Sequence, residues 1–314
     1  MRRSAVLILL GLSAITTADD LTTEFGGHTK FRAVGQSYPE DSLFRDYIGS
    51  DTLDLGAELR LNLKLDSGHW TFESAYQLAG LDGEGLKLIG PPNDDRRLMD
   101  LTDIISEGSD NAVLHRIDRL WLGYASEKTV VRLGRQALSW GNGLSYVPMD
   151  LVNPFDPASI DTEYKAGDDM LYAQYLQDNG NDVQAAYVFR RDILTGDVKS
   201  DEATAAVKYH GFTGEGEYDL LIARSYGDPV IGVGAGRGIG GAVWGADLVV
   251  TDTDLDTYLQ FVTNVMYSWT WGEKNMSGSL EYYFNGFGQS DGLYDPVSLA
   301  ANPDLLDRVS RAEL

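Results

Sequence analysis

The strongest constraint on the fold is an alternation of apolar and polar residues with a period of two. From Leu53 to Asp66, leucine or alanine occupies every second position, and charged or polar residues and one glycine fill the others. A helix would spread these residues around its surface, whereas a strand sorts them onto two opposite faces. The run exceeds the about 5–6 residues of a soluble strand and suits the roughly 9–11 of a tilted membrane-spanning strand.

The same alternation recurs along the rest of the chain. Clear repeats occupy 70–78, 183–190, 259–271 and 280–285. Weaker candidate strands occupy 27–34, 112–125, 129–137, 168–178, 202–211, 216–225, 229–235 and 238–250. Together these segments predict an all-β fold with about 13 strands. The glycine-rich segment 232–241 is expected to contain a tight turn that separates two of them.

The N-terminal residues have the layout of a secretory signal peptide, which we expect to span residues 1–18. Arg2 and Arg3 precede an apolar segment at 5–15, and small residues follow it. This apolar segment is too short to cross a membrane as a helix. Residues 19–314 are then expected to form a single domain in an exported protein.

The connections between the predicted strands indicate a membrane barrel. Tight links alternate with long ones over most of the chain, as in outer-membrane barrels with short periplasmic turns and long external loops. The long links are 35–51, 81–111, 138–167, 192–201 and 289–314. Acidic pairs such as Asp94-Asp95 and Asp168-Asp169 are expected in these external loops. A soluble β-sandwich is the alternative, but its alternating stripes would be shorter.

Aromatic residues close several of the apolar stripes, where a barrel would place its girdles at the membrane interfaces. The girdle candidates are Trp70, Tyr124, Trp269 and Trp271. We therefore expect an antiparallel transmembrane β-barrel with about 12–14 strands visible, in the bacterial outer membrane. Such barrels have an even strand number, and the stretch 290–314 is polar. We therefore expect either that the sequence stops before the barrel is complete or that the strand count is off by one.

Composition excludes several other classes of protein. The chain has no cysteine, which excludes a disulfide framework, a thiolate metal site and a cysteine nucleophile. A formal net charge of −23 argues against nucleic-acid binding. The four histidines fall in separate predicted strands without ligand spacing, and no nucleophile–base pair stands out. We predict neither a cofactor nor an enzyme, and an outer-membrane lipase is the less favoured alternative.

The most specific motifs lie in residues 132–156. The pattern R-x-G-R-Q-x-x-x-W-G occupies 132–141, and D-x-x-N-P-x-D occupies 150–156. This stretch resembles a group of Gram-negative outer-membrane, porin-like barrels, many of them without an assigned substrate. The resemblance is close over these residues and looser over the strand layout. It implies the fold and the location of the protein rather than a particular solute.

Loop 138–167 follows a strand whose Arg132, Gly134 and Gln136 are expected to face the lumen. Its prolines cannot join a β-ladder. Because it is long and follows a strand with lumenal arginines, the loop is expected to fold inward and narrow the pore. Opposed arginines and carboxylates across a constriction select solutes by charge. The constriction candidates are Arg116, Arg119, Arg132, Arg135 and Gln136 on the wall and Asp150, Asp156 and Glu163 on the loop. In the alternative interpretation, these ion pairs only stabilise a polar interior.

Two further motifs lack the context that would give them a function. Residues 236–241 match G-x-G-x-x-G, but no parallel strand precedes them and no helix follows, so a turn or kinked strand is expected. Asp252, Asp254 and Asp256 alternate, but Thr257 and Thr263 stand where a calcium loop needs Gly and Glu. We expect no metal centre, and loose binding of divalent cations to acidic external loops is a weak alternative.

These observations predict an outer-membrane, porin-like channel for passive diffusion of small polar or charged solutes. Its expected partners are the lipid bilayer, lipopolysaccharide and the solute. A structural or interaction barrel with a plugged lumen is the alternative from another functional class.

Overall fold

A computed structural model describes residues 3–6, 10–18, 21–40, 42, 44–155, 161–289, 298 and 301–311 of the chain. The chain divides into two compact units. Unit 1 comprises Met1–Ala125 with Gly134–Gln136, and unit 2 comprises Ser126–Leu133 with Ala137–Leu314. No helix in the described part of the chain is long and apolar enough to cross a membrane.

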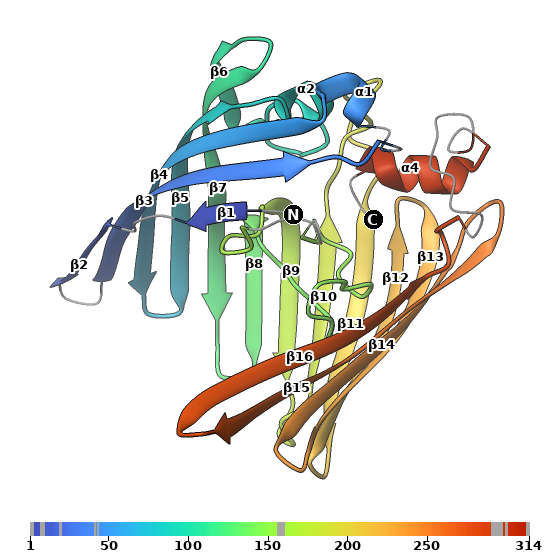
Figure 1. The fold of residues 1–314 in the computed structure, drawn as a ribbon. Helices are drawn as coiled ribbons and strands as arrows, with labels where there is room; N and C mark the ends of the chain where they lie inside the picture. The colour runs from blue at the N-terminus through green and yellow to red at the C-terminus, as the bar shows by residue number, and fades with distance from the viewer. Residues whose placement is uncertain are drawn as a thin grey trace. The chain divides into compact units, whose positions relative to one another are not determined.

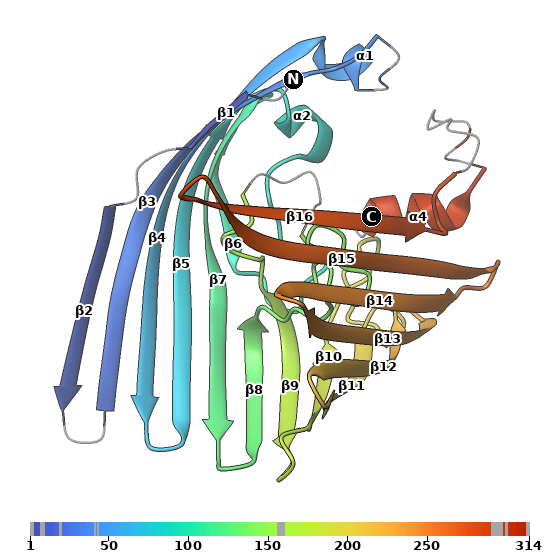
Figure 2. The same ribbon diagram turned by 60° about the horizontal axis from the view of Figure 1, so that its bottom comes forward.

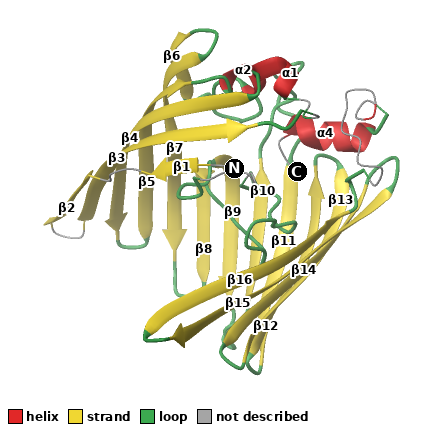
Figure 3. Cartoon of the chain, viewed as in Figure 1, coloured by secondary structure: helices red, strands yellow, loops and turns green. Residues whose placement is uncertain are grey.

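Unit 1 is an antiparallel sheet whose long strands follow one another along the chain (Figure 1). Strands β3, β4, β5 and β7 pair in this order, β1 and β2 pair with β3, and β6 pairs with β7. The strands are β1 (Arg3–Val6), β2 (Leu10–Ala18), β3 (Leu21–Ser37), β4 (Asp51–Ser67), β5 (Trp70–Asp82), β6 (Thr102–Glu107) and β7 (Asn111–Ala125). The short helices α1 (Arg45–Ile48) and α2 (Leu86–Ile89) lie in its long connections (Figure 3).

Unit 2 continues the antiparallel pattern, and Figure 2 shows β9 to β16 side by side in chain order. Strand β8 (Thr129–Gln136) contributes its first five residues to this unit. The other strands are β9 (Asp168–Leu176), β10 (Asp182–Val188), β11 (Thr204–Thr213), β12 (Gly216–Ser225), β13 (Asp228–Ile239), β14 (Ala242–Asp252), β15 (Thr257–Trp271) and β16 (Lys274–Asn285). Helix α4 (Pro303–Arg311) follows the last strand.

The all-β, antiparallel prediction is confirmed, and each of the predicted strands overlaps a strand of the structure. The tight turn expected in the glycine-rich segment is present as well, since β13 ends at Ile239 and β14 begins at Ala242. Strand β6 and the helices were not predicted, because they lie inside the long connections. Strands β1 and β2 occupy the residues expected to be an export signal and pair with β3, and removal of that segment stays a prediction.

In unit 2, the exposed face of the sheet is apolar, and the covered face holds buried charged residues beside apolar ones. Leu220, Val233 and Leu248 are register partners on three successive strands, and all three are exposed. The adjacent row on the other face contains Asp219 and Asp247, whose carboxylates are buried. Soluble sheets bury apolar side chains and expose charges. Here the apolar row faces outward and the charged row is covered.

Unit 1 repeats this inverted pattern. Leu53, Leu55 and Phe31 are exposed, whereas Arg60 and His28 are buried. The alternation that predicted β4 therefore separates an exposed apolar face from a polar face, as the period of two requires. In the following subsections, the covered face that holds the buried charged residues is called the polar face of each unit.

Candidate functional site

An arginine cluster surrounds one buried carboxylate on the polar face of unit 1. Asp118 accepts hydrogen bonds from Arg60 and Arg119, with nitrogen–oxygen distances of 2.8 Å to its Oδ2 atom in both cases. The Nη2 atom of Arg116 lies 4.0 Å from Oδ1 of the same carboxylate, and Arg116 Nε donates to Gln77. Charge-assisted bonds of this kind are stronger than neutral ones. The cluster concentrates positive charge on this face.

A β-bulge in β7 explains why Arg116, Asp118 and Arg119 all lie on the polar face. The register between β5 and β7 shifts between Ala75 and Tyr76, so that Asp118 is an extra residue on β7. A bulge re-aims the side chains that follow it, and such irregularities are frequent next to functional sites. Arg116 and Arg119, which have opposite parity, are therefore both directed towards Asp118.

A second buried ion pair joins the end of β8 to the long connection before β6. Arg135 Nη1 donates to Asp94 Oδ2 at 2.9 Å, and both side chains are almost fully buried, at 2% and 1% exposure. Asp94 also accepts from Arg97 and from the Leu101 backbone N–H, at 2.7 and 2.8 Å. Although burial alone would raise it, these bonds hold the pKa of Asp94 below its usual value of 3.8. Asp94 lies in the long connection between β5 and β6, where a loop was expected, but its side chain is buried. An external location of this connection stays a prediction.

Gly134 makes this position of Arg135 possible. Its φ of 125° lies in the left-handed region, and a Cβ atom there would stand 2.2 Å from the Leu120 carbonyl oxygen. A residue with a side chain would clash with that carbonyl, so glycine is required. The irregular backbone ends the alternation of β8, and Arg135 and Gln136 are both buried in consequence.

In unit 2, the segment 137–155 folds back onto the polar face of the sheet. Asp247 on β14 accepts from the backbone N–H and the side-chain amide of Asn142, both at 2.7 Å. Glu281 on β16 accepts from the backbone N–H groups of Leu144, Ser145 and Tyr146. These carboxylates accept hydrogen bonds from backbone N–H groups that the loop would otherwise bury without a partner. These contacts hold the loop on the covered face of the sheet, and narrowing of a pore by the loop stays a prediction.

Apolar side chains also pack segment 137–155 against the sheet. Trp140, Met149 and Val152 are buried together with strand residues, including Met170 and Val188, in the core of unit 2. The indole N–H of Trp140 donates to Gln184 Oε1 at 2.7 Å. The loop thus packs its apolar side chains against apolar strand residues, which share this face with the buried charged ones.

A buried ion pair joins Lys165 to Asp150 within loop 138–167. Lys165 Nζ donates to Asp150 Oδ2, to the Leu138 carbonyl and to Ser139 Oγ. Burial raises the pKa of Asp150 from 3.8 to about 6, against the opposing effect of Lys165. In the folded state Asp150 therefore takes up a proton at a higher pH than in the unfolded state.

We expect Asp150 to make the protein less stable as the pH rises from about 4 to about 6, because the unfolded state ionises first in this window. Each unit of pKa difference corresponds to about 1.4 kcal/mol. Asp150→Asn should flatten the plot of unfolding free energy against pH in this window, as measured by urea titration. Asp178→Asn, at an exposed carboxylate paired with Lys128, is the control and should leave the slope unchanged. An equal slope for Asp150→Asn and the unaltered protein would contradict the assignment.

The constriction candidates fall into two groups that lie in different units. Arg116, Arg119, Arg135 and Gln136 belong to unit 1. Arg132, Asp150 and Glu163 belong to unit 2, where the Arg132 guanidinium lies 5.7 Å from the centre of the Tyr172 ring and Glu163 is exposed. Asp156 lies outside the described residues.

The carboxylates that these arginines contact were not predicted. Arg119 pairs with Asp118 and Arg135 pairs with Asp94. Asp168 was expected in a loop, but it is buried at the start of β9 and lies 3.2 Å from Arg190 Nη2. The position of Asp118 between two arginines was the only sequence signal for this cluster.

The aromatic girdle candidates lie at strand ends next to tight turns. Trp70 and Tyr124 are register partners in unit 1, with ring centres 5.2 Å apart in an edge-to-face arrangement. In unit 2, Trp269 stacks on Tyr267 and Trp271 is exposed beside the turn. Exposed aromatic rings at the ends of apolar stripes are typical of membrane interfaces.

Two of the three alternating aspartates, Asp252 and Asp256, are engaged within their own loop. Asp252 accepts from the Thr257 hydroxyl at 2.6 Å, and Asp256 accepts from the Thr257 backbone N–H at 2.7 Å. Among the residues that the structure describes, no group of three or more His, Cys, Asp or Glu side chains is arranged to hold a metal ion.

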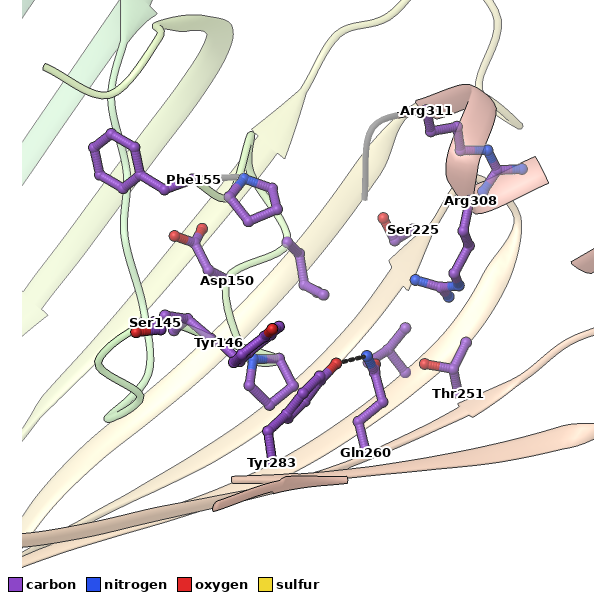
Figure 4. Close-up of a pocket in the computed structure, with 15 residues that line it drawn as sticks. Ser145, Tyr146, Asp150, Phe155, Ser225, Thr251, Gln260, Tyr283, Arg308 and Arg311 are labelled. Carbon is purple, nitrogen blue, oxygen red and sulfur yellow. Dashed lines mark hydrogen bonds between the residues drawn. The ribbon is translucent and has the colours of Figure 1, made fainter. Parts of the chain in front are cut away.

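A recess in unit 2 lies between the folded-back loop, the sheet and α4 (Figure 4). Its lining includes Tyr146 and Asp150 from the loop, Gln260 and Tyr283 from the strands and Arg308 from α4. No protein-family model matches the chain, and no curated protein matches it. The geometry of these sites is therefore the basis for the function proposed below.

Proposed function

We propose that the chain forms a β-barrel in the bacterial outer membrane and conducts small polar or charged solutes by passive diffusion. The inverted sheet carries this proposal, because Leu220, Val233 and Leu248 are exposed while Asp219 and Asp247 are buried. Lipid removes the cost of exposing apolar side chains, and a polar interior accommodates buried charges. The long strands, the exposed aromatic strand ends and the export-signal layout at 1–18 support the same location.

Planar-bilayer recording tests the channel directly. Protein that is folded, as shown by heat-sensitive mobility on gels, should give steady single-channel current steps. Absence of steps from folded, inserted protein would overturn the proposed channel.

The arginine cluster provides the charge preference of this channel. Arginines that line a pore favour anions. Arg116→Gln should therefore lower the ratio of chloride to potassium permeability several-fold, as measured from the reversal potential in a salt gradient. Arg224→Gln is the matched control, because Arg224 is exposed at the end of β12 and donates to the Gly227 carbonyl. Equal shifts for both variants would exclude the cluster as the selectivity element.

A barrel with a plugged lumen is the second candidate, and the apolar core beneath segment 137–155 favours it. Glu281→Ala would remove the acceptor of three backbone hydrogen bonds. Each bond to a charged group contributes about 1.5–3 kcal/mol, so the release equilibrium of the loop should shift by at least about tenfold.

The readouts for Glu281→Ala are protease cleavage within 137–155 and single-channel conductance. A plug predicts an unaltered protein without current and a conducting variant, whereas a constriction predicts current from both and a larger step from the variant. Glu215→Ala is the control, because its carboxylate is exposed in a turn and forms an exposed ion pair with Arg237. Unchanged cleavage in Glu281→Ala would show that this carboxylate does not hold the loop.

A further inference from the structure

An open cavity in unit 1 lies between the ends of three strands and the connection that follows β5. Its lining includes Arg32 and Val34 of β3, Asp54 of β4, Leu81 of β5 and residues of segment 83–93, which contains α2. The cavity has a volume of about 390 Å³. Pockets for small organic ligands commonly have about 300–1,000 Å³, so there is room for one molecule of amino-acid size.

Two oppositely charged side chains of this lining lie on the polar face of the sheet. Arg32 has the same parity on β3 as the buried His28. Asp54 has the same parity on β4 as the buried Arg60. Because Val34 is the register partner of Asp54, Arg32 and Asp54 are diagonal neighbours, and such positions are about 7–8 Å apart. A small molecule can therefore lie between the two charged groups.

The guanidinium of Arg32 has no acidic partner in the described part of the chain. It forms neither an ion pair nor a hydrogen bond with the described residues. Its stem packs over Gly56, where a Cβ atom would stand 2.9 Å from Arg32 Nε. A guanidinium presents a planar pair of donors that matches a carboxylate. Arg32 can thus bind an anionic group in the cavity without giving up an existing side-chain contact.

The carboxylate of Asp54 has spare capacity to accept hydrogen bonds. Its Oδ1 atom accepts from the Gly85 backbone N–H at 2.9 Å, which is its only hydrogen bond to the described residues. A carboxylate has about four acceptor positions, so most of them stay available for an ammonium group. A Cβ atom at Gly83 would stand 2.1 Å from Asp54 Oδ1, so the glycine leaves the room that this carboxylate occupies.

The rest of the lining is mainly apolar. The apolar side chains are those of Val34, Leu81, Leu86, Pro91 and Pro92. The other charged residue of the lining, Asp82, is the register partner of the exposed Leu55, so alternation directs its side chain to the apolar face of the sheet. The cavity thus combines one cation, one anion and an apolar wall.

We propose that this cavity binds the zwitterion of an α-amino acid with an apolar side chain. The carboxylate of the ligand would pair with Arg32, its ammonium group with Asp54, and its side chain would contact Leu81 and Leu86. A zwitterion neutralises both charges of the cavity at once, which a simple anion or cation of the same shape cannot do. Every residue of the site belongs to unit 1, so this proposal goes beyond the channel and does not depend on it.

Titration calorimetry on the full chain in detergent tests the site with four probes: L-leucine, glycine, 4-methylpentanoate and 3-methylbutylamine. Glycine lacks the apolar side chain, 4-methylpentanoate lacks the ammonium group, and 3-methylbutylamine lacks the carboxylate. L-Leucine should bind at least about tenfold more tightly than each of the other three probes.

Two conservative variants remove one charge each. Arg32→Gln should weaken L-leucine binding at least about tenfold without weakening the binding of 3-methylbutylamine, which has no carboxylate. Asp54→Asn should weaken L-leucine binding similarly without weakening the binding of 4-methylpentanoate, and its amide oxygen can still accept from Gly85. Arg224→Gln and Asp178→Asn, at exposed side chains of unit 2, are the controls and should bind L-leucine as the unaltered protein does.

Three results would overturn the assignment: 4-methylpentanoate or 3-methylbutylamine binding as tightly as L-leucine, glycine binding as tightly as L-leucine, or an unchanged L-leucine affinity in folded Arg32→Gln or Asp54→Asn. The site and the channel fail separately. L-Leucine binding without single-channel current would retain the site and overturn the channel. Current without L-leucine binding would retain the channel and overturn the site.

Discussion

Arg135→Ala should destabilise the protein by about 3–5 kcal/mol, because it leaves a buried carboxylate without its main cation. Arg135 and Asp94 are both almost fully buried and lie 2.9 Å apart. Arg135 also donates to the carbonyl oxygens of Met99 and Ile117, so the substitution unpairs backbone acceptors as well. Urea unfolding of the refolded protein in lipid vesicles measures the change in unfolding free energy.

Two further variants show whether the buried charge causes this loss. The double variant Arg135→Ala with Asp94→Ala should be more stable than Arg135→Ala alone, because the buried carboxylate is removed together with its cation. Lys64→Ala removes the cation from an ion pair with Asp66 in which both side chains are partly exposed. Exposed pairs contribute about 0–1 kcal/mol, so this control should have a small effect. Equal losses for Arg135→Ala and Lys64→Ala would contradict the buried-pair interpretation.

Leu220→Arg should cost about 2–4 kcal/mol if the exposed face of unit 2 contacts the interior of a bilayer. Leu220 lies in the middle of β12 and is 49% exposed, so a long side chain meets no steric obstacle there. In a soluble sheet, an arginine at such an exposed site would be nearly neutral. The difference between these outcomes is measured by urea unfolding in lipid vesicles.

Phe212→Arg is the depth control for this experiment. Phe212 is exposed on β11 but lies beside the turn that leads to β12. Arginine near a membrane interface costs only about 0–1 kcal/mol. A strong effect at Leu220 and a weak one at Phe212 would locate the bilayer along the strands. Similar small effects at both positions would overturn the membrane location.

The sequence contained enough information to predict the strands but not the ion pairs. Alternation is a local property, so the period of two in residues 53–66 directly predicts β4 and its two faces. It also places Glu281 on the polar face, between the exposed Leu280 and Tyr282. Glu281 accepts hydrogen bonds from three N–H groups of loop residues more than 130 positions earlier in the chain. No local sequence pattern can indicate a pairing over such a distance.

The arginine cluster could be predicted only in part, because two irregularities break the alternation that the prediction used. The bulge at Asp118 adds a residue to β7, and the left-handed Gly134 ends the regular part of β8. Strict alternation would put Arg135 on the same face as Leu133, which is exposed, whereas Arg135 is buried. Arg135 was a candidate from its motif, but its partner Asp94 lies 41 residues away, in a connection for which no pairing was predicted.

The attachment of segment 137–155 also sets an order of events during folding. Asn142 bonds to Asp247 across 105 positions, and Leu144 bonds to Glu281 across 137 positions. Contacts of such long sequence separation form late, because chain entropy must be lost before they contribute. Until β14 and β16 are in place, the loop has neither acceptor. We therefore expect an intermediate with an assembled sheet and an unattached loop, in which closing of the loop is the last step of maturation.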